Sequence, residues 1–230
     1  ALIYMGGTFG CIGEPLIPMP DQAFLPLLEK IIPPHLQVEC FAAPSIKDSS
    51  ACTAVDWLQL IQQIQQLQRN NYQHFVIIHG TDTMSYAAAT LARFLGDSCH
   101  AIITGSQYPL LNVDGNDTRE FTDAPGNLYL ALEQVLKLPV GVYLAFHQQV
   151  FHAQTTLKIH TTELDAFTGI PATQECQTSA NQFIVHDKHI TQAAQLCVLN
   201  LMLQPISPQQ FTLQLKNILA APPQFLVLQG

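Results

Sequence analysis

Short apolar runs alternate with amphipathic stretches from residue 1 to residue 146. Apolar side chains recur at helical spacing within 53–69, whereas runs such as "FVII" have the length and composition of buried strands. Strands that alternate with helices are typical of parallel βα units. The sequence therefore predicts an α/β fold, a Rossmann-like doubly wound sheet that is mostly parallel. The expected strands are 1–5, 36–44, 74–80, 101–107 and 140–146, and the expected helices are 21–32, 53–69, 85–95 and 127–136.

The alternation stops after the first 168 residues, which we expect to form the N-terminal domain. Residues 169–192 are predicted to be a linker that includes a small hairpin. Residues 193–230 return to a strand, helix and strand order, the beginning of a second, smaller α/β domain that we expect to be incomplete. The expected elements there are 196–203, 207–219 and 224–230.

Small polar residues follow four of the expected strands at the point where each strand ends. They are Thr8 in "GGTFG", Ser49 and Ser50 in "DSS", Thr81 and Asp82 in "HGTDT", and Ser106 in "TGSQ". Taken singly, each motif could be a tight turn or a helix cap. Because the carboxyl ends of parallel strands meet at one edge of a sheet, we expect the four motifs to form one hydroxyl-rich cleft.

The motifs that are present and absent restrict the chemistry of this cleft. The sequence contains no GxGxxG after the first strand, no GxxxxGK[ST] and no GxSxG. It therefore gives no support for a glycine loop that binds the phosphates of a dinucleotide or nucleotide, or for the nucleophile elbow of the α/β-hydrolases. What remains is one threonine in a glycine turn and a second beside a carboxylate. Such a site suits nucleophilic attack on a carbonyl, with backbone N–H groups holding the oxyanion, and it needs a base.

These motifs resemble those of the bacterial-type L-asparaginases. The resemblance rests on "GGTFG", "DSS", "HGTDTMSYAAATL", "TGSQYPL", "DAPGNLYLAL" and "TTLKIHTTELDAF", and it covers residues 1–168. It implies an amidohydrolase that converts L-asparagine and water into L-aspartate and ammonia without a cofactor. The preference between L-asparagine and L-glutamine is left open, because one methylene changes the free energy of recognition by only about 1 to 3 kcal/mol.

The resemblance also implies a role for each matching residue. Thr8 would be the nucleophile that forms the acyl-enzyme ester, and Thr81, Asp82 and Lys158 would form a proton-transferring group. Ser49 would hold the substrate α-carboxylate, and Asp82 would also bind the α-ammonium. Backbone groups are expected from Gly7, Gly80 and Ser106, and Ser50 falls where many relatives have Gln. From the sequence alone a lone lysine such as Lys158 is more often a solvated strand residue, so its role depends on the resemblance.

One position departs from the family pattern. Leu16, in "CIGEPLIPMP", falls where relatives carry a tyrosine that assists the nucleophile. We expect a shortened lid organised around Glu14 and three prolines, or a weak activity. A non-catalytic amino-acid-binding or assembly module that keeps the cleft is therefore the alternative function. We also expect poor catalysis from these 230 residues alone, because family members continue into a complete second domain.

Composition bears on partners and location. A net charge of −8 with only nine Lys and Arg argues against nucleic acid, and against an amidotransferase subunit that acts on misacylated tRNA. Charged residues are 11%, below the usual ~25%, which favours burial in a homo-oligomer, a dimer or a tetramer. No apolar segment approaches the ~18 residues of a membrane span and no signal-peptide pattern opens the chain, so we expect a cytoplasmic protein with no membrane partner.

Cysteines and histidines show no ligand pattern. Six cysteines are scattered without zinc spacing, and we expect reduced thiols: Cys11, Cys40, Cys52, Cys99, Cys176 and Cys197. His147, His152 and His160 are spaced through an expected hairpin, but a metal site needs carboxylate or thiolate partners at a defined geometry, which this spacing does not indicate, so no metal is predicted. His79 is interpreted as a structural hydrogen-bonding residue.

Overall fold

The computed structural model describes residues 1–178, 181–202 and 205–229. The chain divides into two compact units, Ala1–His186 and Asp187–Gly230. Each unit is described by itself below, and the first contains all the residues predicted to form the cleft.

The first unit is built on a six-stranded sheet in the order β4-β1-β5-β6-β7-β8. Its first five strands are parallel and β8 is antiparallel to β7. The strands are β1 (Leu2–Gly6), β4 (Cys40–Lys47), β5 (His74–Ile78), β6 (His100–Thr104), β7 (Gly141–Phe146) and β8 (Gln149–His152). This arrangement confirms the predicted α/β fold with a mostly parallel sheet.

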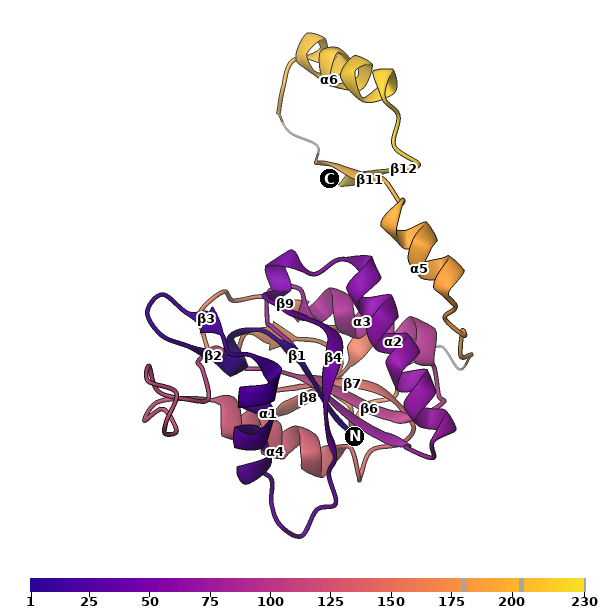
Figure 1. Ribbon diagram of the computed structural model, residues 1–230. Coiled ribbons are helices and arrows are strands. Elements are labelled where there is room, and N and C mark those ends of the chain that lie inside the picture. The colour runs from indigo at the N-terminus through magenta and orange to yellow at the C-terminus, as the bar shows by residue number, and fades with distance from the viewer. Residues whose placement is uncertain (179–180, 203–204, 230) are drawn as a thin grey trace. The chain divides into compact units, whose positions relative to one another are not determined.

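Helices cover both faces of the sheet, as Figure 1 shows. The helices α1 (Asp21–Lys30) and α4 (Ala124–Gln134) lie on one face, where Phe24 and Leu128 join a buried cluster with Tyr4 of β1. On the other face lie α2 (Ala54–Arg69) and α3 (Met84–Leu95). Successive side chains of a strand point to opposite faces of the sheet. Since helices cover both faces, both sets of side chains of a central strand are buried, which explains its continuous run of apolar residues.

The strand order changes direction at β1. The chain passes from β1 to β4 on one side and then crosses back to β5 on the other. Ligands of open α/β sheets bind at such a switch point, outside the carboxyl ends of the strands. The two motifs that flank it are "GGTFG" after β1 and "HGTDT" after β5.

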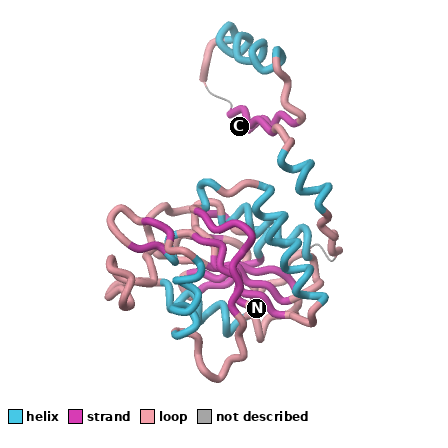
Figure 2. Tube along the Cα trace, in the orientation of Figure 1, coloured by secondary structure: helices cyan, strands magenta, loops and turns pink. Residues whose placement is uncertain are grey.

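Short elements surround the carboxyl edge of the sheet (Figure 2). The strands β2 (Cys11–Ile12) and β3 (Ile17–Pro18) form an antiparallel hairpin, and β9 (Leu157–Lys158) pairs with β10 (Phe167–Thr168). The described residues of this unit also form three 3-10 turns, η1 (Thr8–Gly10), η2 (Ser49–Ala51) and η3 (Ala153–Thr155).

Two elements begin three or more residues away from their predicted starts. The strand β4 begins at Cys40 rather than at residue 36, because its register pairs Cys40 with Leu2 of β1. The helix α4 begins at Ala124 rather than at Asn127, with a proline in its first turn. Proline is favoured there because its missing N–H would have no helical partner.

The second unit contains α5 (Asp187–Ala194), β11 (Val198–Met202), α6 (Pro208–Ala220) and β12 (Phe225–Gln229). The strands β11 and β12 are parallel, which gives the strand, helix and strand order that the sequence predicted. The helix α5 occupies part of the stretch in which we expected a hairpin; its first turn carries Asp187, an acidic residue that suits a helix N-terminus. The predicted strand ends at residues 203 and 230 lie outside the described residues.

No helix in the described part of the chain is long and apolar enough to cross a membrane.

Candidate active site

The glycine turns that follow β1 and β5 are in direct backbone contact. Gly7 has φ 79° and ψ −178°, a conformation open almost only to glycine. A Cβ atom added to Gly7 would lie 2.3 Å from the Cα of Gly80. Thr8 and Thr81 follow these two glycines directly, so the backbones that carry the two threonines lie close together at the edge of the sheet.

Ser49 joins the same point from the end of β4. Its side chain is buried, and its Oγ accepts a hydrogen bond of 3.2 Å from the backbone N–H of Asp82. A Cβ atom on Gly80 would lie 2.5 Å from the Ser49 Oγ. The structure therefore brings the "GGT", "DSS" and "HGTDT" motifs together in one cluster.

The side chain of Lys158 reaches this cluster from β9. Its Nζ donates to the Thr81 Oγ1 at 2.9 Å and to the Asp82 Oδ1 at 2.8 Å. The lysine side chain is only 15% exposed, whereas the Asp82 side chain is 55% exposed. One ammonium thus holds a buried hydroxyl and an accessible carboxylate side by side, and the predicted group of Thr81, Asp82 and Lys158 is assembled.

Sequence reasoning missed Gln107, which contacts this group from the end of β6. Its Oε1 accepts from the Thr81 Oγ1 at 3.3 Å, and its Nε2 donates to the carbonyl oxygens of Thr161 and Glu163. The Gln107 backbone N–H donates to both carboxylate oxygens of Asp123, at 3.1 Å to Oδ1 and 3.0 Å to Oδ2. Both residues lie inside quoted motifs, "TGSQYPL" and "DAPGNLYLAL", but nothing in their spacing indicates that they meet.

The buried imidazole of His79 supports the turn after β5. Its Nε2 accepts from the indole N–H of Trp57 at 3.2 Å, and its Nδ1 lies 2.7 Å from the carbonyl oxygen of Gly80. Because a carbonyl accepts, Nδ1 carries the proton and the ring is neutral. Burial lowers the pKa of His79 and so favours this neutral form. The structural interpretation of His79 agrees with these contacts.

The helix-capping alternatives apply only in part. The Thr83 Oγ1 donates to the carbonyl oxygen of Ser49 at 2.7 Å and makes no capping bond to α3. Asp48 accepts from the Ser50 N–H at 2.8 Å and so caps η2, whereas Thr53 is the N-cap residue of α2. The "DSS" and "HGTDT" motifs are therefore bound to each other, and the only side-chain cap described for them is that of Asp48 on η2.

A model of the family described as "Asparaginase, N-terminal" matches residues 1–191. The chain belongs to the asparaginase family. It is 30% identical over 183 residues to "L-asparaginase 1" of Escherichia coli (strain K12), an alignment that covers 72% of this chain and 49% of that protein. It is 29% identical over 194 residues to the "60 kDa lysophospholipase" of Mus musculus, which covers 72% of this chain and 33% of that protein. The chain thus spans half or less of the length of these asparaginase-family relatives.

The fold agrees with this family assignment. The thermostable L-asparaginase of Thermococcus kodakarensis superposes with a TM-score of 0.76 at 21% identity, covering 100% of this chain and 70% of that one. The likeness extends the asparaginase-type α/β fold to this chain.

Among the described residues, four predicted side chains lie outside the hydrogen-bonded cluster: those of Thr8, Leu16, Ser50 and Ser106. Ser50 is exposed, and the buried Ser106 donates its hydroxyl to the carbonyl oxygen of Tyr108 at 2.6 Å. Ser106 still lies beside the cluster, because a Cβ atom on its neighbour Gly105 would lie 2.2 Å from the His79 carbonyl oxygen. Leu16 lies in the turn between β2 and β3, 48% exposed, and supplies no hydroxyl.

All six cysteines of this asparaginase-family chain have free thiols. Among residues 1–178, 181–202 and 205–229, no three His, Cys, Asp or Glu side chains are grouped as metal ligands. His147 occupies the turn between β7 and β8, and the His152 Nε2 donates to the Gln174 carbonyl oxygen at 2.9 Å.

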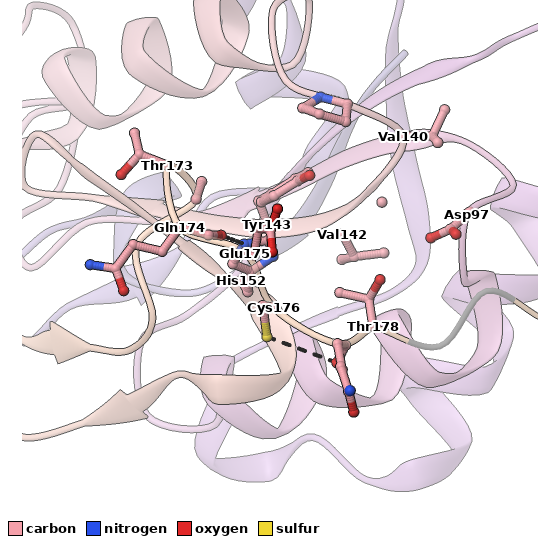
Figure 3. A pocket seen from close by; sticks show the side chains of 14 residues that line it. Asp97, Val140, Val142, Tyr143, His152, Thr173, Gln174, Glu175, Cys176 and Thr178 are labelled. Carbon is pink, nitrogen blue, oxygen red and sulfur yellow. Dashed lines mark hydrogen bonds between the residues drawn. The ribbon is translucent and has the colours of Figure 1, made fainter.

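A separate cavity of about 800 Å³ lies at the opposite edge of the sheet. It is lined by Asp97, by residues 139–143 at the start of β7, by His152 and by residues 172–178 (Figure 3). None of the residues predicted for the asparaginase-like cleft lines it. The cluster at Gly7 and Gly80 remains the candidate active site.

The contact between the two glycine turns gives a testable expectation for stability. Gly7→Ala would place a Cβ atom against the Gly80 backbone and force a positive φ on alanine, so we expect a loss of roughly 3 kcal/mol or more in the free energy of unfolding. Urea unfolding measures this loss. The matched control is Gly126→Ala in α4, where nothing lies within 4 Å of the new Cβ and a gain of up to about 1 kcal/mol is expected. Equal stabilities for the two variants would contradict the described packing.

Proposed function

We propose that the protein is an amidohydrolase that hydrolyses L-asparagine to L-aspartate and ammonia through an acyl-enzyme on Thr8. The observation that carries this proposal is the pair of hydrogen bonds from the Lys158 Nζ to Thr81 and Asp82. They join a buried hydroxyl, a cation and an accessible carboxylate at the switch point of the sheet, next to the turn that carries Thr8.

In the proposed reaction, the Thr8 Oγ attacks the side-chain amide carbon, and ammonia leaves as the ester forms. Backbone N–H groups of the glycine turns stabilise the negative oxygen of the tetrahedral intermediate. Water then attacks the ester and releases L-aspartate and the Thr8 hydroxyl. For this step Lys158 acts in its amine form: Thr81 passes the proton of the attacking Thr8 oxygen to the Lys158 amine, and the same proton returns through Thr81 to the leaving nitrogen, which departs as ammonia.

Recognition of the amino-acid part of the substrate is assigned to two neighbouring residues. Ser49 would hold the α-carboxylate, and the exposed Asp82 carboxylate would hold the α-ammonium. The bond between the Asp82 N–H and the Ser49 Oγ keeps the two groups adjacent, as one small substrate requires. Gly7, Gly80 and Ser106 would contribute backbone groups.

The state of the active protein is part of this proposal. We propose a homo-oligomer in the cytoplasm, consistent with the low content of charged residues and the six free thiols. No nucleic acid or membrane is proposed as a partner.

An ammonia-release assay with L-asparagine and L-glutamine, together with binding of L-aspartate, tests the function. We expect ammonia from L-asparagine. Binding of L-aspartate without ammonia release from either amide would favour the non-catalytic module instead. Fatty-acid release from lysophosphatidylcholine is measured in parallel, because the mouse relative is called a lysophospholipase. Cleavage of this lipid without cleavage of either amide would contradict the proposed amide substrate and indicate an ester substrate instead.

A further inference from the structure

The loop that carries Ser49 is short and lies between β4 and α2. Three hydrogen bonds donated by backbone N–H groups within it shape η2: from Ser50 to the Asp48 side-chain Oδ1 at 2.8 Å, from Ala51 to the Asp48 carbonyl oxygen at 3.0 Å, and from Cys52 to the Ser49 carbonyl oxygen at 3.1 Å. These bonds fix the form of the loop, and a backbone bond of 3.1 Å from the Gly7 N–H to the Lys47 carbonyl oxygen joins its first end to the turn after β1. The ends are Lys47, the last residue of β4, and Thr53, the residue before α2.

One carboxylate, that of Asp56, binds both ends of this loop. Its Oδ1 lies 2.9 Å from the Lys47 Nζ, and its Oδ2 accepts from the Thr53 N–H at 2.7 Å and the Thr53 Oγ1 at 2.9 Å. Asp56 is 5% exposed. Although burial disfavours the charged carboxylate, hydrogen bonds from Lys47, Thr53 and Ser45 hold the pKa of Asp56 below its ordinary value.

We propose that Asp56 is a positioning residue that sets the place of Ser49 and thereby the affinity for the substrate α-carboxylate. This inference rests on the proposed function, in which Ser49 holds that carboxylate. Asp56 contacts none of Thr8, Thr81 and Lys158 in the contacts described above, so it acts on the recognition of the α-carboxylate rather than on the bond-making groups. Its loss loosens the Ser49 loop, whereas the bonds from the Lys158 Nζ still hold Thr81 and Asp82 together.

Calorimetric binding of L-aspartate and steady-state ammonia release from L-asparagine test the inference on the full chain. For Asp56→Asn we expect the Kd of L-aspartate and the KM of L-asparagine to rise by roughly tenfold, because a small displacement of a positioning group has effects of this order. We expect kcat to stay within about twofold, because the bond-making groups are untouched. Lys47→Met removes the other side of the ion pair and should act in the same way.

Two further variants separate positioning from general damage. Lys47→Arg keeps the ion pair with Asp56 and should restore affinity to within about twofold of the wild type. Glu133→Gln makes the same carboxylate-to-amide change in an exposed pair, that of Glu133 at the end of α4 with Lys137 beyond it, and should leave both constants unchanged. Melting temperatures accompany every variant, and if Asp56→Asn fails to fold, the comparison of Lys47→Met with Lys47→Arg decides.

Several results would overturn the inference. These are an unchanged Kd in Asp56→Asn or Lys47→Met, a fall in kcat as large as the rise in KM, or a Lys47→Arg variant as weak as Lys47→Met. Wild-type protein that binds L-aspartate but releases no ammonia contradicts the proposed function alone, and the Kd values then still judge Asp56. Wild-type protein that binds no L-aspartate contradicts the inference.

Discussion

Replacing Thr8 with alanine is expected to reduce ammonia release from L-asparagine by at least about a thousandfold, because the acyl-enzyme cannot form without its hydroxyl. Thr81→Val, which keeps the shape of the side chain and removes the hydroxyl, is expected to have an effect of similar size. Thr81 contacts Lys158 and Gln107 through that hydroxyl, so valine breaks the path for the proton. Steady-state ammonia release with each purified variant measures both effects.

Folding is controlled separately for these threonine variants. Thr8 is half-buried beside a glycine turn, so its substitution should shift the melting temperature little. Thr90→Ala on α3, which removes a hydroxyl bonded to the Tyr86 carbonyl oxygen, is the matched control and should retain full turnover. If Thr8→Ala kept nearly wild-type ammonia release, the threonine acyl-enzyme would be wrong.

Lys158→Met is expected to lower kcat by a hundredfold to ten-thousandfold, in the range typical of a lost proton-transfer group (~10² to 10⁴). Methionine keeps most of the length of the side chain and removes the ammonium that lies 2.9 Å from the Thr81 Oγ1. Binding of L-aspartate should weaken much less, because Ser49 and Asp82 remain. Stopped-time ammonia assays and calorimetry measure the two quantities on the same preparation.

The control for Lys158→Met is Lys137→Met. In the wild type Lys137 forms an exposed ion pair with Glu133, so its replacement should leave activity unchanged. Equal losses of turnover and of L-aspartate affinity in Lys158→Met would make Lys158 a binding residue. The outcome therefore separates proton transfer from recognition.

The local parts of the fold could be predicted from the sequence, because burial imposes a period on each element. Strand β5 and helix α2 lie close to their expected positions, since their apolar residues follow the strand and helix patterns. The order of the strands could not be predicted in this way, because pairing joins residues that are distant in the chain. The register of Leu2 with Cys40, which moved the start of β4, is one such case.

The same distinction holds for the candidate site. The position of hydroxyls at strand ends could be predicted, because a parallel sheet gathers its carboxyl ends. The partner of Thr81 could not be predicted from pattern alone, since 77 residues separate it from Lys158 and only the family resemblance indicated the pair. Gln107 and Asp56 were missed, because their roles depend on contacts between side chains that no spacing records.

The backbone contact between Gly7 and Gly80 also limits how this site could be moved to another protein. A designer who grafted only the threonines onto a different α/β scaffold would separate them, since any scaffold with side chains at these two positions holds its turns farther apart. The turns after β1 and β5 would have to be transferred as one unit, together with the Ser49 loop that fills the space beside Gly80. In this chain the smallest portable part of the candidate site is thus a set of three interlocked turns rather than a list of side chains.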